Sequence, residues 1–298
     1  MAAPFWVGMA SLVDLKANPL LAERVTASAD LELSRRIGLG RQAVLAQTEL
    51  FIAQFGRAAS HWKHDGTRVT DADLAISATL TATLRSAFGA DDFFSEELAV
   101  GAAPIPCRSE WTWVLDPIDG TNNYALGIPL TAISLGLLRH GEPVYGFVYD
   151  FGRRSLFHGG PGQGLWLDSA PVQTAFGPTG RHERIVALHA PLDDRHQPLI
   201  NAVLGRYKLR AFGSGALHLT YAALGIIDAC MDFTVKVWDI AAAAAFCRET
   251  GAQMHFFNGS PFPLRQFDLK MPPIHYTAGS PEAVAEIVAL VEKTRAAQ

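Results

Sequence analysis

The sequence predicts a protein whose first half is α+β and whose second half is α/β. Two observations support this prediction. Up to about residue 175, helical periodicity comes first and several strand-like runs follow it, whereas beyond residue 181 strands and helices alternate. Helices followed by strands indicate α+β architecture, and alternation indicates α/β architecture. The segment FGPTGR, residues 176–181, is the best candidate for the connection between the halves. The expected parts are an extension over 1–28, an α+β subdomain over 29–178 and an α/β subdomain over 179–298.

The elements of the first half follow from periodicity and turn chemistry. Residues 30–55 predict a helix in which Gly38 and Gly40 are candidate breaks, and HWKHDGTRVT predicts a loop or a hairpin because Asp-Gly is a strong turn signal. A second helix follows Thr70, because apolar residues then recur every four positions. Strands are expected at DDFFSEEL, WTWVL, LTAISLGLL, PVYGFVYD and GLWLD, with the glycine-rich GGPGQG as a hairpin turn.

The elements of the second half alternate in type. Strands are expected at RIVALHA, KLRAF and DACMDF. Helices are expected over residues 198–204, at ALHLTYAALG and at IAAAAAFCRETG, the last closed by Gly251 as a C-terminal cap.

Composition bounds the function. The 298 residues are 49% hydrophobic and 18% charged, which suits a large buried core. A net charge of −4 argues against a general nucleic-acid binder. Three widely spaced cysteines without a CxxC pair argue against a zinc or thioredoxin-type site and fit a reducing compartment. No apolar run approaches a membrane span, and no basic residue precedes the apolar start of the chain, so we expect no membrane association and a cytoplasmic location.

Two carboxylates end the apolar run in WTWVLDPIDGTNNY. Asp116 and Asp119 are expected at the carboxyl end of a strand, where ligands bind in α/β-type sheets. Two neighbouring carboxylates repel each other and need a cation or a shared proton, and Mg²⁺ is the usual cation with oxygen ligands. Asp-Pro and Asp-Gly are also turn dipeptides, so these residues alone leave an ordinary turn open.

Further polar residues favour a site for a phosphate ester. Glu96 and Glu97 end a predicted strand, although they also suit a solvated face. Asp73 and Asp239 open helices, where capping by these residues is the alternative. Gly120 and Thr121 directly follow the second aspartate and can present backbone N–H groups to an anion. Metal-binding carboxylates beside an anion site are what the hydrolysis of a phosphate ester requires. The ten histidines show no metal-binding spacing, so we expect no histidine-ligated metal.

Four segments in order resemble the inositol monophosphatase superfamily. They are KHDGTRVTDAD, FFSEEL, WVLDPIDGTNNY and VKVWDIAAAAAFCRETGA, and the resemblance covers roughly residues 30–290. Small departures are Ser95, where the family often has glycine, and Ala243, which replaces the glycine of the family's WD-x-AAG block. The resemblance implies a sugar-phosphatase fold with αβαβα layers, hydrolysis of a phosphate monoester with two or three Mg²⁺ ions, lithium sensitivity and a homodimer.

The resemblance also implies roles for individual residues. The metal ligands would be Glu96, Asp116, Asp119 and Asp239, the backbone carbonyl of Ile118, and Asp73 for a third, weaker ion. Thr121 would activate the attacking water with Asp73, Glu97 would support catalysis from behind the ligands, and Lys63 would be a nearby cation. Gly120 and Thr121 would bind phosphate through backbone N–H groups.

The alcohol half of the substrate is less well specified. RAFGSGALHL resembles the family segment beside the leaving group, which would place Gly213, Ser214 and Gly215 there. Asp232 takes the place of a glutamate that binds substrate hydroxyls, and its side chain is one methylene shorter. Inositol phosphate and histidinol phosphate are both open; fructose 1,6-bisphosphate and a 3′-phosphoadenosine phosphate are less favoured. A regulatory protein- or RNA-binding member of the same fold is the alternative from another class.

Overall fold

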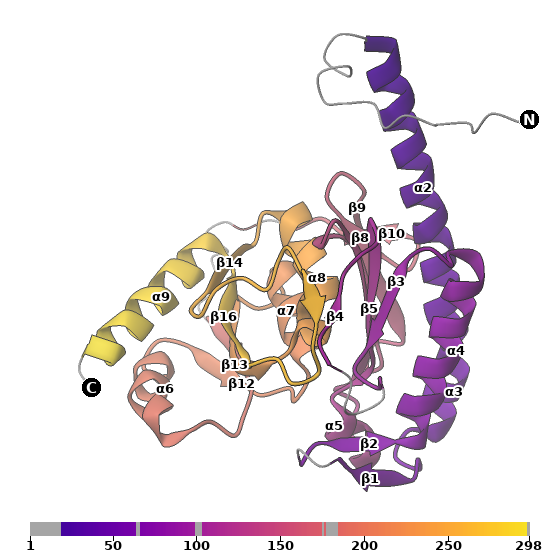
Figure 1. The fold of residues 1–298 in the computed structure, drawn as a ribbon. Coiled ribbons are helices and arrows are strands. Elements are labelled where there is room, and N and C mark those ends of the chain that lie inside the picture. The colour runs from indigo at the N-terminus through magenta and orange to yellow at the C-terminus, as the bar shows by residue number, and fades with distance from the viewer. Residues whose placement is uncertain (1–18, 64–65, 99–102, 175, 177–183, 297–298) are drawn as a thin grey trace, which may run out of the picture. The chain divides into compact units, whose positions relative to one another are not determined.

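The computed structural model describes residues 19–63, 66–98, 103–174, 176 and 184–296 (Figure 1). Most of the predicted extension, residues 1–18, and residues 177–183, which include most of the predicted connection FGPTGR, lie outside this part. The chain divides into two compact units, Met1–Gly40 and Arg41–Gln298. The described residues of the first unit are helical. All features of the sheets and of the candidate site below belong to the second unit.

The N-terminal helix begins earlier and breaks later than the sequence predicted. Helix α2 spans Pro19–Leu45 and helix α3 spans Thr48–Gln54. Gly38 and Gly40 lie inside α2 and do not break it, whereas the predicted start at residue 30 was wrong, because α2 begins at Pro19. Each glycine costs a helix only about 1 kcal/mol relative to alanine, which a helix of this length tolerates. The break comes where the Thr48 hydroxyl donates to the Leu45 carbonyl at 2.8 Å.

A seven-stranded sheet contains most of the first half. Its order is β10-β9-β8-β7-β6-β5-β3, and only the β3–β5 pair is parallel. The strands are β3 (Asp92–Ser95), β5 (Trp111–Asp119), β6 (Ala132–Arg139), β7 (Glu142–Asp150), β8 (Ser155–Gly160), β9 (Gly164–Leu167) and β10 (Ala170–Pro171). The predicted antiparallel run is confirmed, and GGPGQG does form the β8–β9 turn. Strand β8 was missed because its sequence, SLFHGG, ends in two glycines, which are depleted in strands.

Smaller elements surround this sheet. The predicted hairpin forms as β1 (Ser60–Trp62) and β2 (Arg68–Thr70), and β4 (Ile105–Pro106) pairs with β15 (Gln266–Phe267). Helix α4 (Asp71–Ala87) begins with the capping box that the Thr70–Asp73 spacing suggested, and α5 (Thr121–Leu126) follows β5.

A five-stranded mixed sheet contains the second half, in the order β12-β11-β13-β16-β14. Strand β11 is parallel to β12 and β13, whereas β16 is antiparallel to both of its neighbours. The strands are β11 (Ile185–Leu188), β12 (Lys208–Arg210), β13 (Ala229–Val235), β14 (Gln253–Phe256) and β16 (Ile274–Gly279). The helices are η1 (Asp194–His196), α6 (Gln197–Leu204), α7 (Gly215–Ala223), α8 (Val237–Thr250) and α9 (Pro281–Ala296). The predicted alternation of strands and helices is confirmed.

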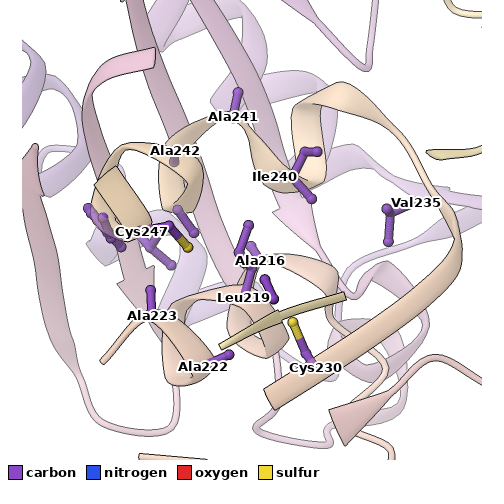
Figure 2. Close-up of a cluster of buried hydrophobic side chains, with 14 of the residues drawn as sticks. Ala216, Leu219, Ala222, Ala223, Cys230, Val235, Ile240, Ala241, Ala242 and Cys247 are labelled. Atoms are coloured by element: carbon purple, nitrogen blue, oxygen red, sulfur yellow. The ribbon is translucent and has the colours of Figure 1, made fainter. Parts of the chain in front are cut away.

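The second unit is built in five layers. Helices α3 and α4 cover one face of the seven-stranded sheet, and α7 and α8 fill the space between the two sheets (Figure 1). Helices α6 and α9 cover the far face of the five-stranded sheet. The αβαβα arrangement is therefore confirmed, and a large hydrophobic cluster lies around α7 and α8 (Figure 2).

Helix α8 packs unusually close to the first sheet because glycines lie beneath its alanines. Gly136 on β6 pairs with Gly146 on β7, and a Cβ atom at Gly146 would lie only 2.1 Å from the carbonyl oxygen of Ala242. A Cβ atom at Gly136 would lie 2.8 Å from that of Ala241. Ala241 and Ala242 are completely buried on the helix (Figure 2). The alanine-rich sequence of α8 and the two glycines thus fix the distance between helix and sheet.

Candidate active site

Asp116 and Asp119 lie at the carboxyl end of strand β5, as predicted, although the strand continues beyond the expected WTWVL and includes both residues. Residues three apart on a regular strand point to opposite faces. The pairing of β5 with β6 is irregular between these two residues, and this bulge brings both carboxylates to one site. Both side chains are almost fully buried, and Asp116 accepts a hydrogen bond from the Ile118 N–H at 3.1 Å.

Asp239 joins these two carboxylates from the other half of the chain. It lies in the first turn of α8, where its Oδ2 accepts a hydrogen bond from the Lys236 N–H at 2.6 Å. One carboxylate oxygen from each of Asp116, Asp119 and Asp239 lies within 4.8 Å of the other two. The close packing of α8 on the sheet therefore completes a cluster of three carboxylates.

The N-terminus of α7 holds Asp119 in place. The Ser214 hydroxyl donates to Asp119 Oδ2, and the N–H of Ala216 donates to the same oxygen at 2.8 Å. The N–H of Gly215 donates to Oδ1 at 3.3 Å. The predicted contact of Ser214 and Gly215 with a leaving group stays a prediction, because the polar groups described here face Asp119. A Cβ atom at Gly215 would lie 3.2 Å from Asp239 Cβ, so this glycine allows the close approach of α7 and α8.

Lys63 connects the two predicted glutamates. Its ammonium group donates to Glu96 at 2.9 Å and to Glu97 at 2.6 Å, and all three side chains are mostly buried. Burial would lower the pKa of Lys63, but the two carboxylates outweigh it and the pKa is raised. The lysine, predicted only as a nearby cation, is therefore a fixed positive charge that orients both glutamates.

Asp73 and Thr121 lie side by side. Asp73 is fully buried and accepts hydrogen bonds from the N–H and hydroxyl of Thr70, which complete the capping box of α4. The Thr121 hydroxyl lies 3.4 Å from Asp73 Oδ1 and 2.9 Å from the carbonyl oxygen of Ile118. Burial raises the pKa of Asp73 to about 7. The capping and functional interpretations of Asp73 are thus compatible, since its second oxygen faces Thr121.

Gly120 turns the chain from β5 into α5. It has a φ of 79°, and a Cβ atom there would lie 3.0 Å from the carbonyl oxygens of Gly213 and Leu130. Gly213 also has a positive φ, of 69°, and approaches the Asn123 amide closely. Both glycines are therefore required by the backbone, and they place the N-terminus of α5 directly beside the carboxylates of β5.

The cluster concentrates negative charge in a buried place. Burial is the largest cause of a raised pKa at four carboxyl groups, and at Asp116 and Asp239 the repulsion from neighbouring carboxylates raises it further. The four groups are Glu96, Asp116, Asp119 and Asp239. Without a cation, this repulsion can be relieved only by bound protons, such as one shared between Asp116 and Asp239. A donor set made of carboxylate oxygens fits a hard divalent cation such as Mg²⁺, whose charge offsets this repulsion.

A second polar cluster, which the sequence did not predict, surrounds Asp232. This fully buried carboxylate accepts hydrogen bonds from the His189 N–H at 2.7 Å and from His218 Nδ1 at 3.2 Å, with the Tyr276 hydroxyl at 3.3 Å. Burial would raise the pKa of Asp232, but the two histidines lower it below its ordinary value. The protein itself thus satisfies the carboxylate that was predicted to bind substrate hydroxyls.

Ligand-capable atoms of His189, His218 and Asp232 lie within 4.8 Å of one another, which raises the question of a second metal. His218 Nε2 already accepts a hydrogen bond from the Phe212 N–H at 3.0 Å, so its proton must lie on Nδ1, facing Asp232. A histidine that binds a metal through one nitrogen carries its proton on the other. His218 therefore has no nitrogen available for a metal in this arrangement, and the cluster is a hydrogen-bond network.

Comparison with known proteins agrees with this geometry. A model of the inositol monophosphatase family matches residues 26–295. The chain belongs to the inositol monophosphatase family. Members of this family are metal-dependent phosphomonoesterases. Among curated relatives, the inositol-1-monophosphatase ImpA of Mycolicibacterium smegmatis is 31% identical over 242 residues, which cover 78% of this chain and 85% of the relative.

Relatives with other names, and solved structures, also match this chain. The fructose-1,6-bisphosphatase/inositol-1-monophosphatase of Methanocaldococcus jannaschii is 34% identical over 178 residues, covering 59% of this chain and 66% of the relative. The Nus factor SuhB of Xylella fastidiosa is 33% identical over 165 residues, which cover 51% of this chain and 57% of the relative. Among solved structures, the Thermotoga maritima IMPase superposes with a TM-score of 0.73 at 21% identity, covering 87% of this chain and 98% of that one. This superposition confirms the predicted fold. No helix in the described part of the chain has the length and apolar character needed to cross a membrane.

Proposed function

We propose that the protein hydrolyses a small phosphate monoester by direct attack of water on phosphorus, with two or three Mg²⁺ ions as cofactors. The observation that carries this proposal is the convergence of Asp116, Asp119 and Asp239 within 4.8 Å, from a strand and a helix about 120 residues apart. Family membership supports the reaction class. Bound ions would supply charge neutralisation for the phosphoryl oxygens and a lowered pKa for a coordinated water.

The side chains around the ligands would position the reacting water. The Thr121 hydroxyl can donate a hydrogen bond to Asp73 Oδ1, and a lone pair on its oxygen can accept a hydrogen bond from the attacking water. A water held in this way loses its proton as it attacks, and a buried carboxyl with a pKa of about 7 suits the acceptance of a proton near neutral pH. The phosphate–alcohol bond breaks in the same displacement, and the leaving oxygen takes a proton to give the free alcohol.

The substrate's two ends would meet different parts of the site. The N–H groups of Gly120 and Thr121 at the start of α5 suit the phosphate oxygens. Asp232 is satisfied by the protein, so we assign recognition of the alcohol to its neighbour His189. The His189 ring lies close enough to Asp119 to affect that carboxyl's pKa, and its buried Nδ1 has no hydrogen-bond partner in the described part of the chain. A polyol phosphate such as inositol 1-phosphate, or histidinol phosphate, offers hydroxyl or amine groups to the partly exposed His189 ring.

The test is phosphate release from a panel of substrates by three proteins. The panel contains inositol 1-phosphate, histidinol phosphate, fructose 1,6-bisphosphate and 3′-phosphoadenosine 5′-phosphate, each with Mg²⁺, with EDTA, and with Mg²⁺ plus lithium. Wild type is compared with Asp116→Asn and with Asp150→Asn, a matched control in which an equally buried aspartate outside the cluster is changed. We expect Mg²⁺-dependent phosphate release from one of the first two substrates. The release should fall more than about a hundredfold in Asp116→Asn only, because mutation of even an outer partner of a metal ligand reduces metal affinity or activity about 10–100-fold.

Two results would contradict the proposal. Undiminished release by Asp116→Asn would show that the carboxylate cluster is not the catalytic centre. No release from any substrate, by a folded protein that still binds Mg²⁺, would favour a non-catalytic role. The relative named as a Nus factor makes binding to a protein or RNA partner the next role to examine.

A further inference from the structure

A second hollow lies on the opposite face of the five-stranded sheet from the carboxylate cluster. It has a volume of about 240 Å³ and is enclosed by η1 and α6, by β13 and β16, and by the end of α9. Figure 1 shows α6 and α9 on the side of this sheet that faces away from α7. Its floor is apolar, formed by Leu199, Phe233 and Val291.

The alternation of side chains along β13 separates this hollow from the candidate active site. Asp232 faces α7 and contacts His218, whereas the next residue, Phe233, packs in the hydrophobic cluster that includes Leu199 and Val291. Successive residues of a strand point to opposite faces of a sheet. A ligand in the hollow therefore does not occupy the place of the substrate.

The polar residues that line the hollow are basic, apart from the hydroxyl of Thr294. They are Arg195, His196, His275 and Arg295, from three different segments of the chain. Burial and the positive charges of its neighbours, including both arginines, lower the pKa of His275. Asp193 lies 3.4 Å from Arg195, but both side chains are more than half exposed, so water screens this pair strongly. Positive charge thus gathers here on a chain whose net charge is −4.

The rings in the hollow are held in place by packing. His196 stacks on Phe233 with ring centroids 4.4 Å apart, and the His275 ring meets the same phenylalanine edge-on at 5.6 Å. The guanidinium of Arg295 packs on Phe257 at 5.5 Å.

We propose that this hollow binds a small phosphate-bearing anion, with Arg195 and Arg295 facing the phosphate and His196 and His275 completing its hydrogen bonds. Arginine forks match the geometry of phosphate oxygens and bind them through charged hydrogen bonds. The volume fits inorganic phosphate or a small organic phosphate rather than a nucleic-acid strand. This site does not depend on the proposed catalytic function, because it shares no residue with the carboxylate cluster.

The experiment is calorimetric titration of the full chain with inorganic phosphate in EDTA at constant ionic strength. EDTA leaves the carboxylate cluster without cations, so that its negative charge repels phosphate. The test variant is Arg195→Gln/Arg295→Gln. The control is Arg184→Gln/Arg206→Gln, which also removes two arginines from the second half of the chain, but from ion pairs with Glu286. We expect saturable binding to wild type and to the control, weakened at least about tenfold in the test variant.

Hydrogen exchange then locates the bound phosphate. We expect phosphate to slow exchange in residues 194–199 and in the last turns of α9. Absence of saturable binding to wild type would overturn the proposal, as would equal binding by the test variant. Protection confined to β5 and the start of α7 would overturn it as well, because it would place the phosphate at the carboxylate cluster.

Discussion

Replacement of Gly146 by alanine tests the link between the packing of α8 and the position of Asp239. The new Cβ atom would lie 2.1 Å from the carbonyl oxygen of Ala242 and 2.7 Å from its carbonyl carbon. Ordinary contacts begin at about 3.4 Å, so helix and sheet would have to separate by roughly 1 Å. The obstructing atoms belong to the backbone, and no change of side-chain rotamer relieves the contact.

The expected loss of stability is at the upper end of the range for overpacking. Helix α8 is buried from Ile240 to Cys247, so its displacement disturbs contacts with both sheets. Overpacked cores lose about 1–3 kcal/mol, and we expect about 3 kcal/mol here. A displacement of about 1 Å at Asp239, in the first turn of the same helix, should also reduce kcat/KM about a hundredfold.

Two assays measure these effects. Urea unfolding followed by tryptophan fluorescence gives the free energy of unfolding, and phosphate release gives kcat/KM on the best substrate of the panel. Gly89→Ala is the matched control: its new Cβ atom would meet only the Arg85 carbonyl oxygen, at an ordinary 3.6 Å, so we expect a change within about 0.5 kcal/mol. If Gly146→Ala unfolded at the same urea concentration as wild type, with normal activity, the proposed role of the glycine in fixing α8 would be refuted.

Three further substitutions test individual contacts. Ser214→Ala removes one of the donors to Asp119, and we expect the Mg²⁺ concentration for half-maximal activity to rise about 10–100-fold; an unchanged requirement would mean that Ser214 does not position this ligand. Asp73 has a pKa of about 7 in the folded protein against an ordinary value of 3.8. Between these two pH values the folded protein holds a proton on Asp73 that the unfolded chain has lost, so its stability falls as pH rises from about 4 to about 7. When urea unfolding is measured in EDTA across this pH range, the free energy of unfolding should fall by up to about 4 kcal/mol less in Asp73→Asn than in wild type. An identical pH dependence in the two proteins would contradict the raised pKa. His189→Ala should raise KM about tenfold with little change in kcat, and the reverse pattern in steady-state kinetics would argue against a binding role.

Local sequence patterns predicted the elements that carry the carboxylates. The Thr70–Asp73 spacing predicted a capped helix, and the apolar run before Asp116 predicted a buried strand. Both patterns depend on neighbours along the chain, and so does the alanine-rich helix that carries Asp239. Their convergence on one site was predicted from the resemblance of four motifs, because contacts between distant segments leave no local pattern.

The parts that could not be predicted depend on pairing between distant strands. The bulge that turns Asp116 and Asp119 to the same side is a property of the register between β5 and β6. His189 meets Asp232 because β11 runs parallel to β13 with Leu188 opposite Met231, one residue before each of them. No spacing within the sequence encodes that register, and the histidines therefore showed no pattern.

Strand β13 joins the two proposed sites in one element. Its backbone is hydrogen-bonded to β11 on one side and to β16 on the other, so its residues cannot move independently. Asp232 on one face orders His189 and His218 beside the carboxylate cluster, and Phe233 on the other face supports His196 and forms part of the floor of the basic hollow. A phosphate held in the hollow would therefore lie against the back of the strand that orients the alcohol end of the site. Hydrogen exchange at residues 229–235, measured with and without phosphate in EDTA, would show whether occupancy of one face stabilises the strand that serves the other.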